Sequence, residues 1–330
     1  MNLSVIKKFL FILCLSGCVS QDISYKPVSF YDIPGWNEDH MLEAMPALRR
    51  ACQKMSEQRV CQKFMIRDFK TDEELRTFIE ENFTPRLVQS SEGTTGLITG
   101  YYEASLTGTR SQVSPTQVPI YGWPENSSLQ TKTREEIEEG PFPAPIIAWA
   151  DDPVDLFILH VQGSGRLMTP TGEEIRLGYA GNNGQSFKGI GSILKEEGLL
   201  APGMGSMPAM RTWLRAHPEK ARELMKKNPR YIFFKENYGE SPIGAAGTVL
   251  TPERTMAVDT AYTPLNTPLF LVTTDPDGQP IRHLVIAADK GADIKGAIRG
   301  DYFWGHGPVA FSKAGRMKNQ GSFFVLWPKN

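Results

Sequence analysis

The sequence predicts a fold built mainly of β-strands, with α-helices concentrated in a helical N-terminal segment. Apolar residues recur every three or four positions from Met41 to Met55, and again after Thr71, which is typical of amphipathic helices. From Gly96, and again after Gly239, short β-branched or aromatic runs alternate with Gly and Pro turns, as in strands. The chain has 330 residues, 40% of them hydrophobic, which is enough for two domains with cores of their own.

Charge and cysteine content exclude some functions. The formal net charge is −1 and no long basic run occurs, so nucleic acid is not an expected partner. The histidines are scattered and no pair of cysteines is spaced C-x-x-C, which argues against a structural zinc site. Asp259, Asp289, Asp293 and His306 fit no compact metal-binding loop. We therefore expect neither a metal nor another cofactor.

Residues 1–17 have the pattern of a lipoprotein signal peptide. Lys7 and Lys8 precede an apolar run that is too short to cross a bilayer as a mature helix. The following Leu15-Ser16-Gly17-Cys18 resembles the lipobox of bacterial lipoproteins, in which Cys18 becomes the acylated first residue; an ordinary secretory signal with a chance cysteine is the alternative. Acyl chains on Cys18 would hold the protein at a membrane. Because Val19 stands where lipoproteins retained in the inner membrane often carry Asp, we expect the periplasmic face of the outer membrane of a Gram-negative bacterium.

The N-terminal helices are expected to follow a polar tether at residues 18–37. Pro46 interrupts the first helical pattern and predicts a kink or a late start. Cys52 continues the apolar stripe of this helix, so it either pairs with Cys61, which an oxidising periplasm permits, or stays a buried free thiol. The second helix opens at Thr71 with a capping box and is expected to end at Pro85, after burying Leu75, Phe78, Ile79 and Phe83.

The middle and C-terminal parts of the chain alternate strands with short helices. The strand-like region contains the apolar runs Leu97–Glu103, Ile146–Ala150 and Asp155–Gln162. Helices are expected at Phe187–Glu197, after Ser206 and at Glu219–Lys227, and strands at Tyr231–Phe234, Leu269–Val272, His283–Ala287 and Ser322–Trp327. Asp275-Pro276-Asp277-Gly278 predicts a tight turn between two of these strands.

An acidic segment, Ala287–Gly305, carries the strongest functional signal. It combines Asp289, Asp293 and Asp301 with several glycines and with the aromatic run Tyr302-Phe303-Trp304. Such a segment turns tightly while it holds carboxyl groups at the ends of strands, as an acid–base site requires.

Together with four further blocks, this segment resembles the membrane-bound lytic murein transglycosylase A family. The blocks stand in order between Thr99 and the acidic segment: Thr99-Gly100-Tyr101-Tyr102, Asp155–Gly165, Gly178–Gly184 and Asn228–Phe234. The resemblance implies a six-stranded double-psi β-barrel catalytic domain formed by residues 38–103 and 239–330. It also implies an inserted, β-rich substrate-binding domain at residues 104–238, with the glycan in the groove between the two.

The resemblance implies that the chain is a lytic transglycosylase. Enzymes of this family cleave the β-1,4 bond between N-acetylmuramic acid and N-acetylglucosamine in peptidoglycan without water, and leave 1,6-anhydromuramyl ends. The partners it implies are peptidoglycan glycan strands, the membrane through Cys18, and cell-wall synthesis or divisome proteins.

In this family one aspartate acts as both acid and base, and it falls on Asp301, with Asp259 and Asp289 before it. The acid has to be protonated near neutral pH, which requires partial burial. Tyr302-Phe303-Trp304 is a candidate apolar wall, although an aspartate after Gly300 also fits a turn. Lys295 either donates to a sugar or pairs with Asp289, and Arg299 is expected to be a surface charge. Relatives usually carry Gly-Gly-Ala where this chain has Gly291-Ala292-Asp293, so the extra carboxylate lies in solvent or perturbs the site.

Aromatic faces and planar amide or hydroxyl groups in Gly-containing loops are suited to holding sugars. The candidates of these types for substrate binding are Thr99, Tyr101, Gln162, Ser164, Tyr179, Asn182 and Asn183. Two other functions stay open from the residues alone. One is a catalytically inert, peptidoglycan-binding lipoprotein, and the other is a hydrolase in which Asp289 or Asp293 acts as a second carboxylate.

Overall fold

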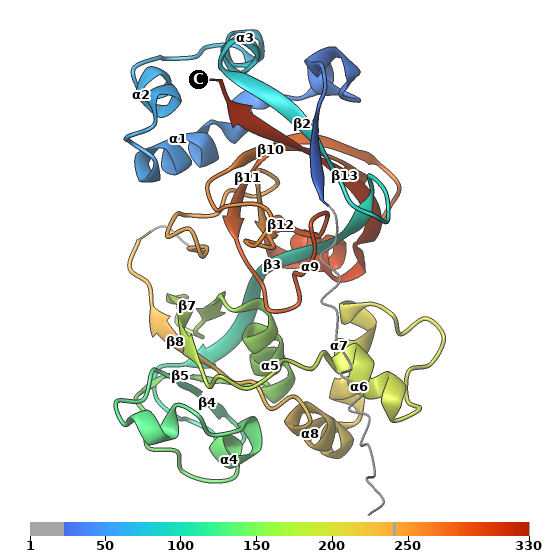
Figure 1. Cartoon of the computed structure of the whole chain (residues 1–330). Coiled ribbons are helices and arrows are strands. Elements are labelled where there is room, and N and C mark those ends of the chain that lie inside the picture. The colour runs from blue at the N-terminus through green and yellow to red at the C-terminus, as the bar shows by residue number, and fades with distance from the viewer. Residues whose placement is uncertain (1–22, 240–241, 330) are drawn as a thin grey trace, which may run out of the picture.

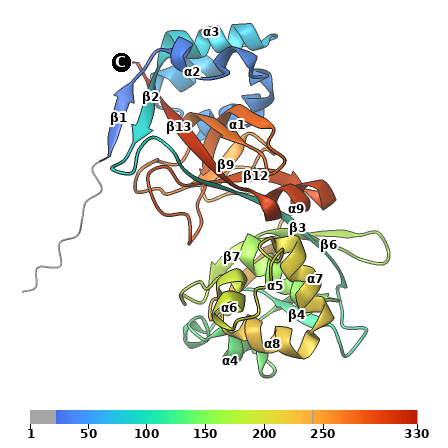
Figure 2. The same ribbon diagram turned by 90° about the vertical axis from the view of Figure 1, so that its right-hand side faces the viewer.

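The computed structural model of the chain describes residues 23–239 and 242–329. These residues form two lobes, one above the other, and the long strand β3 (Gly96–Thr109) runs from the first lobe into the second (Figure 1). The first lobe combines the N-terminal helices with the C-terminal strands, and the second contains the middle of the chain. The view turned by 90° shows the same separation (Figure 2).

Strands of the first lobe come from both ends of the chain: β1 (Ser24–Pro27), β2 (Phe83–Gln89), β9 (Thr255–Val258), β10 (Pro268–Thr274), β11 (Pro280–Asp289), β12 (Gly300–His306) and β13 (Lys318–Pro328). Their pairings follow the order β13–β10–β11–β9–β12–β3, and β13 also pairs with β3, so the path returns to its first strand. β9 is parallel to β11, and β12 is parallel to β3. All four residues of β9 are buried, as expected for a strand covered on both faces.

The helices of the first lobe pack on this sheet: η1 (Phe30–Asp32), η2 (Trp36–Glu38), η3 (Met41–Ala44), α1 (Met45–Lys54), α2 (Arg59–Met65), α3 (Asp72–Asn82) and α9 (Gly307–Arg316). Leu75, Phe78 and Ile79 of α3 are buried in the same apolar cluster as Phe270 and Leu284 of the sheet. A disulfide joins Cys52 at the end of α1 to Cys61 in α2, which resolves the two alternatives for these cysteines.

Two helix predictions in this lobe are confirmed and two need correction. Thr71 and Glu74 form the expected capping box of α3, and the pattern around Pro46 is a late start, since the proline lies in the first turn of α1. Phe83 does not belong to α3, and Pro85 does not end it. The helix ends at Asn82, and Phe83 begins β2, where Pro85 pairs with Leu326 of β13 and its carbonyl accepts from Val28.

The prediction of a polar tether at residues 18–37 also needs correction, because the chain packs on the first lobe from residue 24. Ser24–Pro27 form β1, which pairs antiparallel with β2. Ile33 and Trp36 are both buried in the apolar cluster under the sheet. The signal peptide and Cys18 lie outside the described residues.

The second lobe alternates helices and strands: β4 (Val118–Tyr121), η4 (Ser127–Leu129), α4 (Arg134–Glu138), β5 (Ile146–Ala150), α5 (Pro153–Gln162), β6 (Gly165–Met168), β7 (Glu174–Asn182), α6 (Ile190–Glu196), α7 (Met207–Ala216), α8 (Pro218–Lys226) and β8 (Ile232–Glu236). The second half of β3 pairs with β6 and β5, so this strand belongs to the sheets of both lobes. The three helices expected in this region are present as α6, α7 and α8.

The apolar run Asp155–Gln162, grouped with the strands from sequence, is the helix α5. Asp152 caps its N-terminus, Pro153 occupies the first turn and Gly163 ends it with φ +79°. Leu156, Phe157 and Ile158 are all buried, so the helix is apolar around most of its circumference. A mostly buried helix of this kind lacks the one-sided period by which amphipathic helices are recognised.

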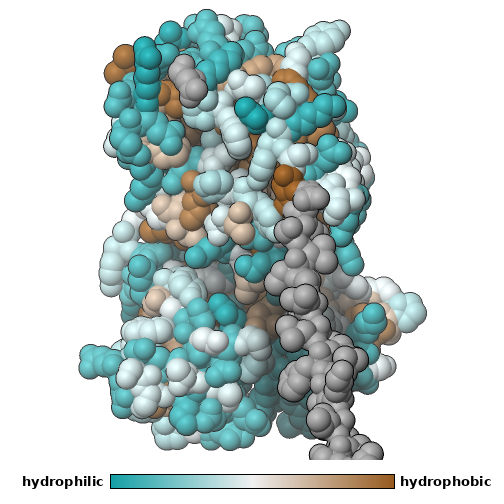
Figure 3. All heavy atoms as spheres, viewed as in Figure 1, coloured by the Kyte–Doolittle hydropathy of each residue, from teal (hydrophilic) through white to brown (hydrophobic). Residues whose placement is uncertain are grey.

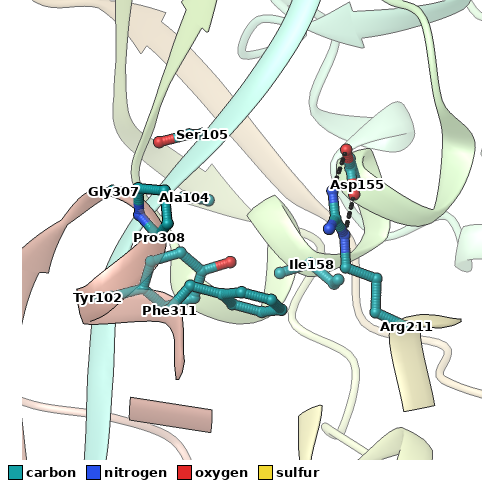
Figure 4. A pocket seen from close by; sticks show the side chains of 9 residues that line it. All are labelled: Tyr102, Ala104, Ser105, Asp155, Ile158, Arg211, Gly307, Pro308 and Phe311. Carbon is teal, nitrogen blue, oxygen red and sulfur yellow. Dashed lines mark hydrogen bonds and ion pairs between the residues drawn. The ribbon is translucent and has the colours of Figure 1, made fainter. Parts of the chain in front are cut away.

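Side chains from both lobes meet at a junction beside β3, which Figure 4 shows. A small pocket of about 210 Å³ lies there. The ring of Phe311 on α9 packs against Tyr102 of β3, with 5.3 Å between centroids, and the Arg211 guanidinium of α7 lies 5.4 Å from the Phe311 centroid. Arg211 also donates two hydrogen bonds, of 2.7 and 2.9 Å, to Asp155 of α5. These contacts tie the C-terminal helix of the first lobe to the second lobe.

The face in Figure 3 is mostly hydrophilic, with isolated apolar residues on both lobes. Among the residues described, no helix combines the length and the apolar character that crossing a membrane requires.

Candidate active site

A cleft of about 420 Å³ lies between the lobes on the side of the acidic segment. The first lobe contributes the start of β3, the residues after β11, the start of β12 and the end of α9. The second lobe contributes the end of α5, part of β7 and the residues around Arg230. Asp301 and Asp289 both line this cleft.

Asp301 is half-buried near the start of β12, between two neighbouring strands. It pairs with Thr99 of β3 on one side and with Ala257 of β9 on the other. The Thr99 hydroxyl donates a 2.6 Å hydrogen bond to the Asp301 carboxyl group. The acid is therefore held on a paired strand and does not lie in a turn, which excludes the turn-capping alternative. A rigid strand fixes a reacting group better than a loop does.

The environment of Asp301 favours its protonated form. Burial raises the pKa of this carboxyl group from 3.8 to about 6, and the negative charge of Asp289 adds to the rise. The hydrogen bond from Thr99 and the positive charge of Arg299 act in the opposite direction. A pKa near the working pH lets one group donate a proton and take one back.

Asp289 ends β11 and is held by backbone amides. The N–H groups of Ala245 and Lys290 donate to its Oδ1, each at 2.9 Å. Burial raises the pKa of Asp289, while these two donors and Tyr101 oppose that rise. The position of the Asp289 carboxyl group is therefore fixed by the backbone.

Tyr101 lines the cleft together with the two carboxyl groups. Its hydroxyl is buried and has no hydrogen-bond partner of standard geometry in the described part of the chain. Burial, followed by the charges of Asp289 and Asp301, raises the pKa of Tyr101 well above its ordinary value. It stays a neutral donor at any working pH.

The glycine of the Thr-Gly-Tyr block has a steric role. A Cβ atom on Gly100 would lie 2.6 Å from the Trp304 side chain and 2.9 Å from the backbone of Ala314. Only glycine lets β3 approach β12 and α9 this closely, and this approach places Thr99 beside Asp301.

About half of the predicted site residues line the cleft. Those that line it are Thr99, Tyr101, Gln162, Tyr179, Asp289 and Asp301; those that do not are Asp259, Lys295, Ser164, Asn182 and Asn183. Tyr179 is 46% exposed, and Gln162 Oε1 accepts from the Tyr102 amide at 3.1 Å.

The predicted residues outside the cleft serve the fold or face solvent. Buried Asp259 accepts from the amides of Ala261 and Gly296, and the Ser164 carbonyl accepts from the Ala104 amide. The Asn182 side chain donates to the Tyr179 hydroxyl and accepts from the Gly184 amide. Lys295 is exposed.

Buried Asn183 is a structural clamp. Its amide donates to the carbonyls of Lys132 and Pro229, both at 2.7 Å, and its oxygen accepts from the Tyr231 amide at 2.8 Å. Its hydrogen-bonding groups are therefore used by the backbone.

The run Tyr302-Phe303-Trp304 does not itself line the cleft, where Ala257 and Met317 lie. The ring of Phe303 packs against that of Tyr101, with 5.1 Å between centroids, so part of this run is apolar surroundings next to the cleft. The expectation for Arg299 is wrong. Arg299 is not a surface charge: it is half-buried, lines the cleft and donates to the carbonyls of Leu97 and Gly300.

Several cleft residues were not predicted from the sequence. They are Phe187, Met207 and Met210, which are apolar, and Arg230 and Lys290, which are basic. Their local sequences carry no signal, since methionines at helical spacing and isolated arginines occur on every globular surface. Within residues 23–239 and 242–329, no group of three or more His, Cys, Asp or Glu side chains is arranged to hold a metal ion.

A larger cavity of about 850 Å³ lies elsewhere in the second lobe. Its carboxyl groups are already paired with cations: Glu139 with Lys226, Asp152 with Arg215 and Glu138 with Arg134. Such groups are poor candidates for acid catalysis, because an ion pair stabilises the ionised form. The cleft with Asp301 is therefore the candidate active site.

Comparisons with known proteins point to one family. Residues 97–235 match the MltA specific insert domain and residues 254–327 match the 3D domain. Membrane-bound lytic murein transglycosylase A of Vibrio cholerae serotype O1 is 31% identical over 244 residues, which are 71% of this chain and 66% of that protein. The match thus spans slightly less than two thirds of this relative's length.

Solved structures cover more of the chain. The lytic transglycosylase LtgG of Burkholderia pseudomallei is 39% identical, with a TM-score of 0.67 over 94% of this chain and 98% of that one. MltA of E. coli with bound chitohexaose is 25% identical, with a TM-score of 0.76 over 93% and 95% of the two chains. From these matches and the strand-rich fold with its insert, the chain belongs to the membrane-bound lytic murein transglycosylase A (MltA) family.

Proposed function

We propose that this protein is a lytic transglycosylase that cleaves the β-1,4 bond between N-acetylmuramic acid and N-acetylglucosamine in peptidoglycan. The observation that carries the proposal is Asp301, a half-buried carboxyl group in the interlobe cleft with a pKa raised to about 6. The sequence resemblance points to the same residue. A related MltA has been solved with chitohexaose, a glycan of N-acetylglucosamine units, which supports a glycan as the occupant of this cleft.

Asp301 would act as acid and then as base. Its proton passes to the glycosidic oxygen as the bond from that oxygen to C1 breaks. The resulting carboxylate takes the proton of the C6 hydroxyl of the same muramyl ring while O6 bonds to C1. The products are a 1,6-anhydro end and a free hydroxyl on the leaving sugar, and Asp301 regains its proton. Asp289 would stabilise the positive charge of the ring, and Tyr101 would orient the sugar.

The test is mass analysis of the fragments released from purified murein sacculi. Wild-type protein is expected to release 1,6-anhydromuropeptides, and Asp301→Asn and Asp301→Ala to lower the rate at least about a thousandfold. Asp68→Asn, at an exposed carboxylate paired with Lys70, is the matched control. Reducing ends, heavier by one water, would instead identify a hydrolase, in which Asp289 or Asp293 is the candidate second carboxylate. Binding without any release would identify an inert peptidoglycan-binding protein.

We also propose the domain division implied by the family. Residues 38–103 and 239–330 would form a six-stranded double-psi β-barrel, and residues 104–238 the inserted domain. The return of the strand pairings from β13 through β12 to β3 and back to β13 supports a closed barrel. The separate matches at residues 97–235 and 254–327 support the insertion.

We propose a lipid anchor at Cys18 and a location on the periplasmic face of the outer membrane. The lipobox-like sequence before Cys18 and the relatives named membrane-bound support this. Cell-wall synthesis or divisome proteins are the proposed protein partners. Loss of membrane association in Cys18→Ser, with full activity on sacculi in solution, is the expected result of fractionation.

A further inference from the structure

Two guanidinium groups line the cleft, and the acid–base chemistry accounts for only one of them, because Arg299 lowers the pKa of Asp301 and Arg230 has no such role. Arg230 comes from the second lobe and Arg299 from the first, and both are half-buried. Within the described ranges neither forms a salt bridge, and their hydrogen bonds go to backbone carbonyls, from Arg230 to Gln185 at 3.2 Å and from Arg299 to Leu97 at 3.4 Å. Half-buried arginines commonly pair with carboxylates, because their planar fork binds both oxygens.

The backbone at Arg230 is fixed from behind. The buried Arg134 donates to the carbonyl of Asn228 at 3.1 Å and to that of Arg230 at 2.8 Å. Asn183 holds the carbonyl of Pro229 between them. Three consecutive carbonyls are therefore held by two buried side chains, so the backbone that carries the Arg230 side chain is rigid. A preorganised charge loses less conformational entropy when a ligand binds.

The charge balance of the cleft favours an anion. Its cations are Arg230, Arg299 and Lys290, and its carboxyl groups are Asp289, Asp293 and Asp301. Asp301 has to carry a proton when it acts as the acid, which leaves three cations against two carboxylates. Asp289 is bound to backbone amides, so Asp293 is the carboxylate that can offset the arginines.

Asp293 is an exposed residue of the cleft lining, on the same lobe as Arg299, whereas Arg230 belongs to the other lobe. The positive charges of Arg299 and Arg230 both act on its carboxyl group and lower its pKa, against a rise caused by burial. No ion pair within 4.0 Å joins Asp293 to either arginine in the part of the chain that the structure describes. The extra aspartate of this chain is therefore a distant counter-charge, which a carboxylate on a ligand can replace.

We propose that Arg230 binds a carboxylate of the substrate, so that this cleft prefers an anionic glycan to a neutral one, with Asp293 as the opposing charge. The proposal rests on the proposed function and adds a determinant of substrate choice to it. In peptidoglycan such a carboxylate has two sources. It is the lactyl group of a muramyl residue without its stem peptide, or an acidic group of the stem peptide itself.

The experiment measures glycan binding by calorimetry in the inactive Asp301→Asn background, so that the probes are not consumed. The probes are chitohexaose, which is neutral, a murein oligosaccharide with free lactyl carboxylates, and the same oligosaccharide with its stem peptides. The readout is the affinity for each anionic probe divided by the affinity for chitohexaose. This ratio cancels any general effect of a substitution on the cleft.

Arg230→Ala is expected to lower this ratio about tenfold for at least one anionic probe, the size of one lost charge-assisted hydrogen bond. Arg230→Lys keeps the charge and is expected to recover part of the loss. Asp293→Asn is expected to raise the ratio about two- to threefold, because it removes a competing carboxylate. Arg222→Ala, an exposed arginine of α8 outside the cleft, is the matched control and leaves the ratio unchanged.

If Arg230→Ala lowers the affinity ratio only for the probe with free lactyl groups, the lactyl group is the carboxylate that Arg230 binds. If it lowers the ratio only for the peptide-bearing probe, that carboxylate belongs to the stem peptide. An unchanged ratio for both anionic probes in Arg230→Ala would overturn the proposal, as would a ratio that falls in Asp293→Asn. The proposed function fails by a different observation, the absence of anhydro products from wild-type protein. Thermal unfolding of each variant checks that the fold is intact.

Discussion

At the scale of single residues, Thr99 and Arg299 act on Asp301 in the same direction. Each lowers the pKa of the acid, against the larger effect of burial, and the balance is a pKa of about 6. Neither residue has to contact the substrate to influence the rate, because the fraction of Asp301 that carries a proton depends on both. The pH profile is therefore the measurement that isolates them.

Thr99→Val removes the hydrogen bond to Asp301 and keeps the shape of the side chain. Since this bond stabilises the carboxylate, its loss is expected to raise the pKa of Asp301 by about 0.5–1 unit. The alkaline limb of kcat/KM against pH then shifts upward by the same amount. Thr107→Val, at an exposed position of the same strand, is the control. A downward shift of the limb would contradict the assignment of Asp301 as the acid.

Asp301→Asn is expected to stabilise the protein while it abolishes turnover. The pKa of the folded state, about 6, lies above that of an unfolded aspartate, so ionisation costs more in the folded state. Replacing the acid with a neutral amide removes this cost, by about 1–3 kcal/mol above pH 6. This gain in the free energy of unfolding decreases as the pH falls through 6 and vanishes below about 4, where the wild-type acid is protonated in both states. Chemical denaturation at pH 8 and at pH 4 measures the difference.

The sequence predicted the candidate acid and its neighbours in the cleft, but it predicted fewer of the other residues that line the cleft. Asp301, Thr99 and Tyr101 follow from blocks whose order resembles a family, and the structure brings them together in the cleft. Asn183 has the same chemical type as a sugar-binding amide but is used by the backbone. Arg230 stands alone before an aromatic strand sequence, and only the fold reveals that it shares the cleft with Asp293.

At the scale of elements, several helices with a clear amphipathic period were predicted correctly, and the mostly buried helix α5, which lacks one, was not. The amphipathic helices α3 and α7 were found with their capping residues, because one face of each is polar. The helix α5 is buried, and its apolar run lacks that contrast. No helix was predicted at Gly307–Arg316, where α9 lies, although Pro308 stands in the first turn, a position that suits the start of a helix.

The disulfide between α1 and α2 is expected to stabilise the helical layer and leave the chemistry unchanged. It closes a loop of about ten residues, so Cys52→Ser with Cys61→Ser is expected to lower the free energy of unfolding by about 2–3 kcal/mol. Thermal unfolding with and without a reductant measures this. The double variant is the control, since its melting temperature does not respond to reductant. Equal melting temperatures of wild-type protein in both conditions would argue that the bond is not formed.

At the scale of the whole molecule, the junction beside β3 sets how the lobes face each other. Phe311 of the first lobe lies against Tyr102 and under the Arg211 guanidinium of the second lobe. Arg211 is itself bound to Asp155. The cleft is made by both lobes, so its width depends on contacts that do not line it.

Phe311→Ala is expected to loosen this junction. The lost packing lowers the free energy of unfolding by about 1–2 kcal/mol and weakens glycan binding several-fold, because the lobes sample more orientations. The pH profile of the reaction stays in place, since Asp301 is untouched. Small-angle scattering and calorimetry measure the two effects. Val309→Ala, at a side chain of α9 that is 73% exposed, is the control and changes neither.

The continuity of β3 has a mechanical consequence. One end of this strand is bonded along β12 and β13, and the other along β6 and β5. A tensile force that a taut polymer exerts on the two lobes would load these ladders in shear, so that many bonds have to break together. The link between the lobes is therefore expected to resist such a force better than a flexible linker would.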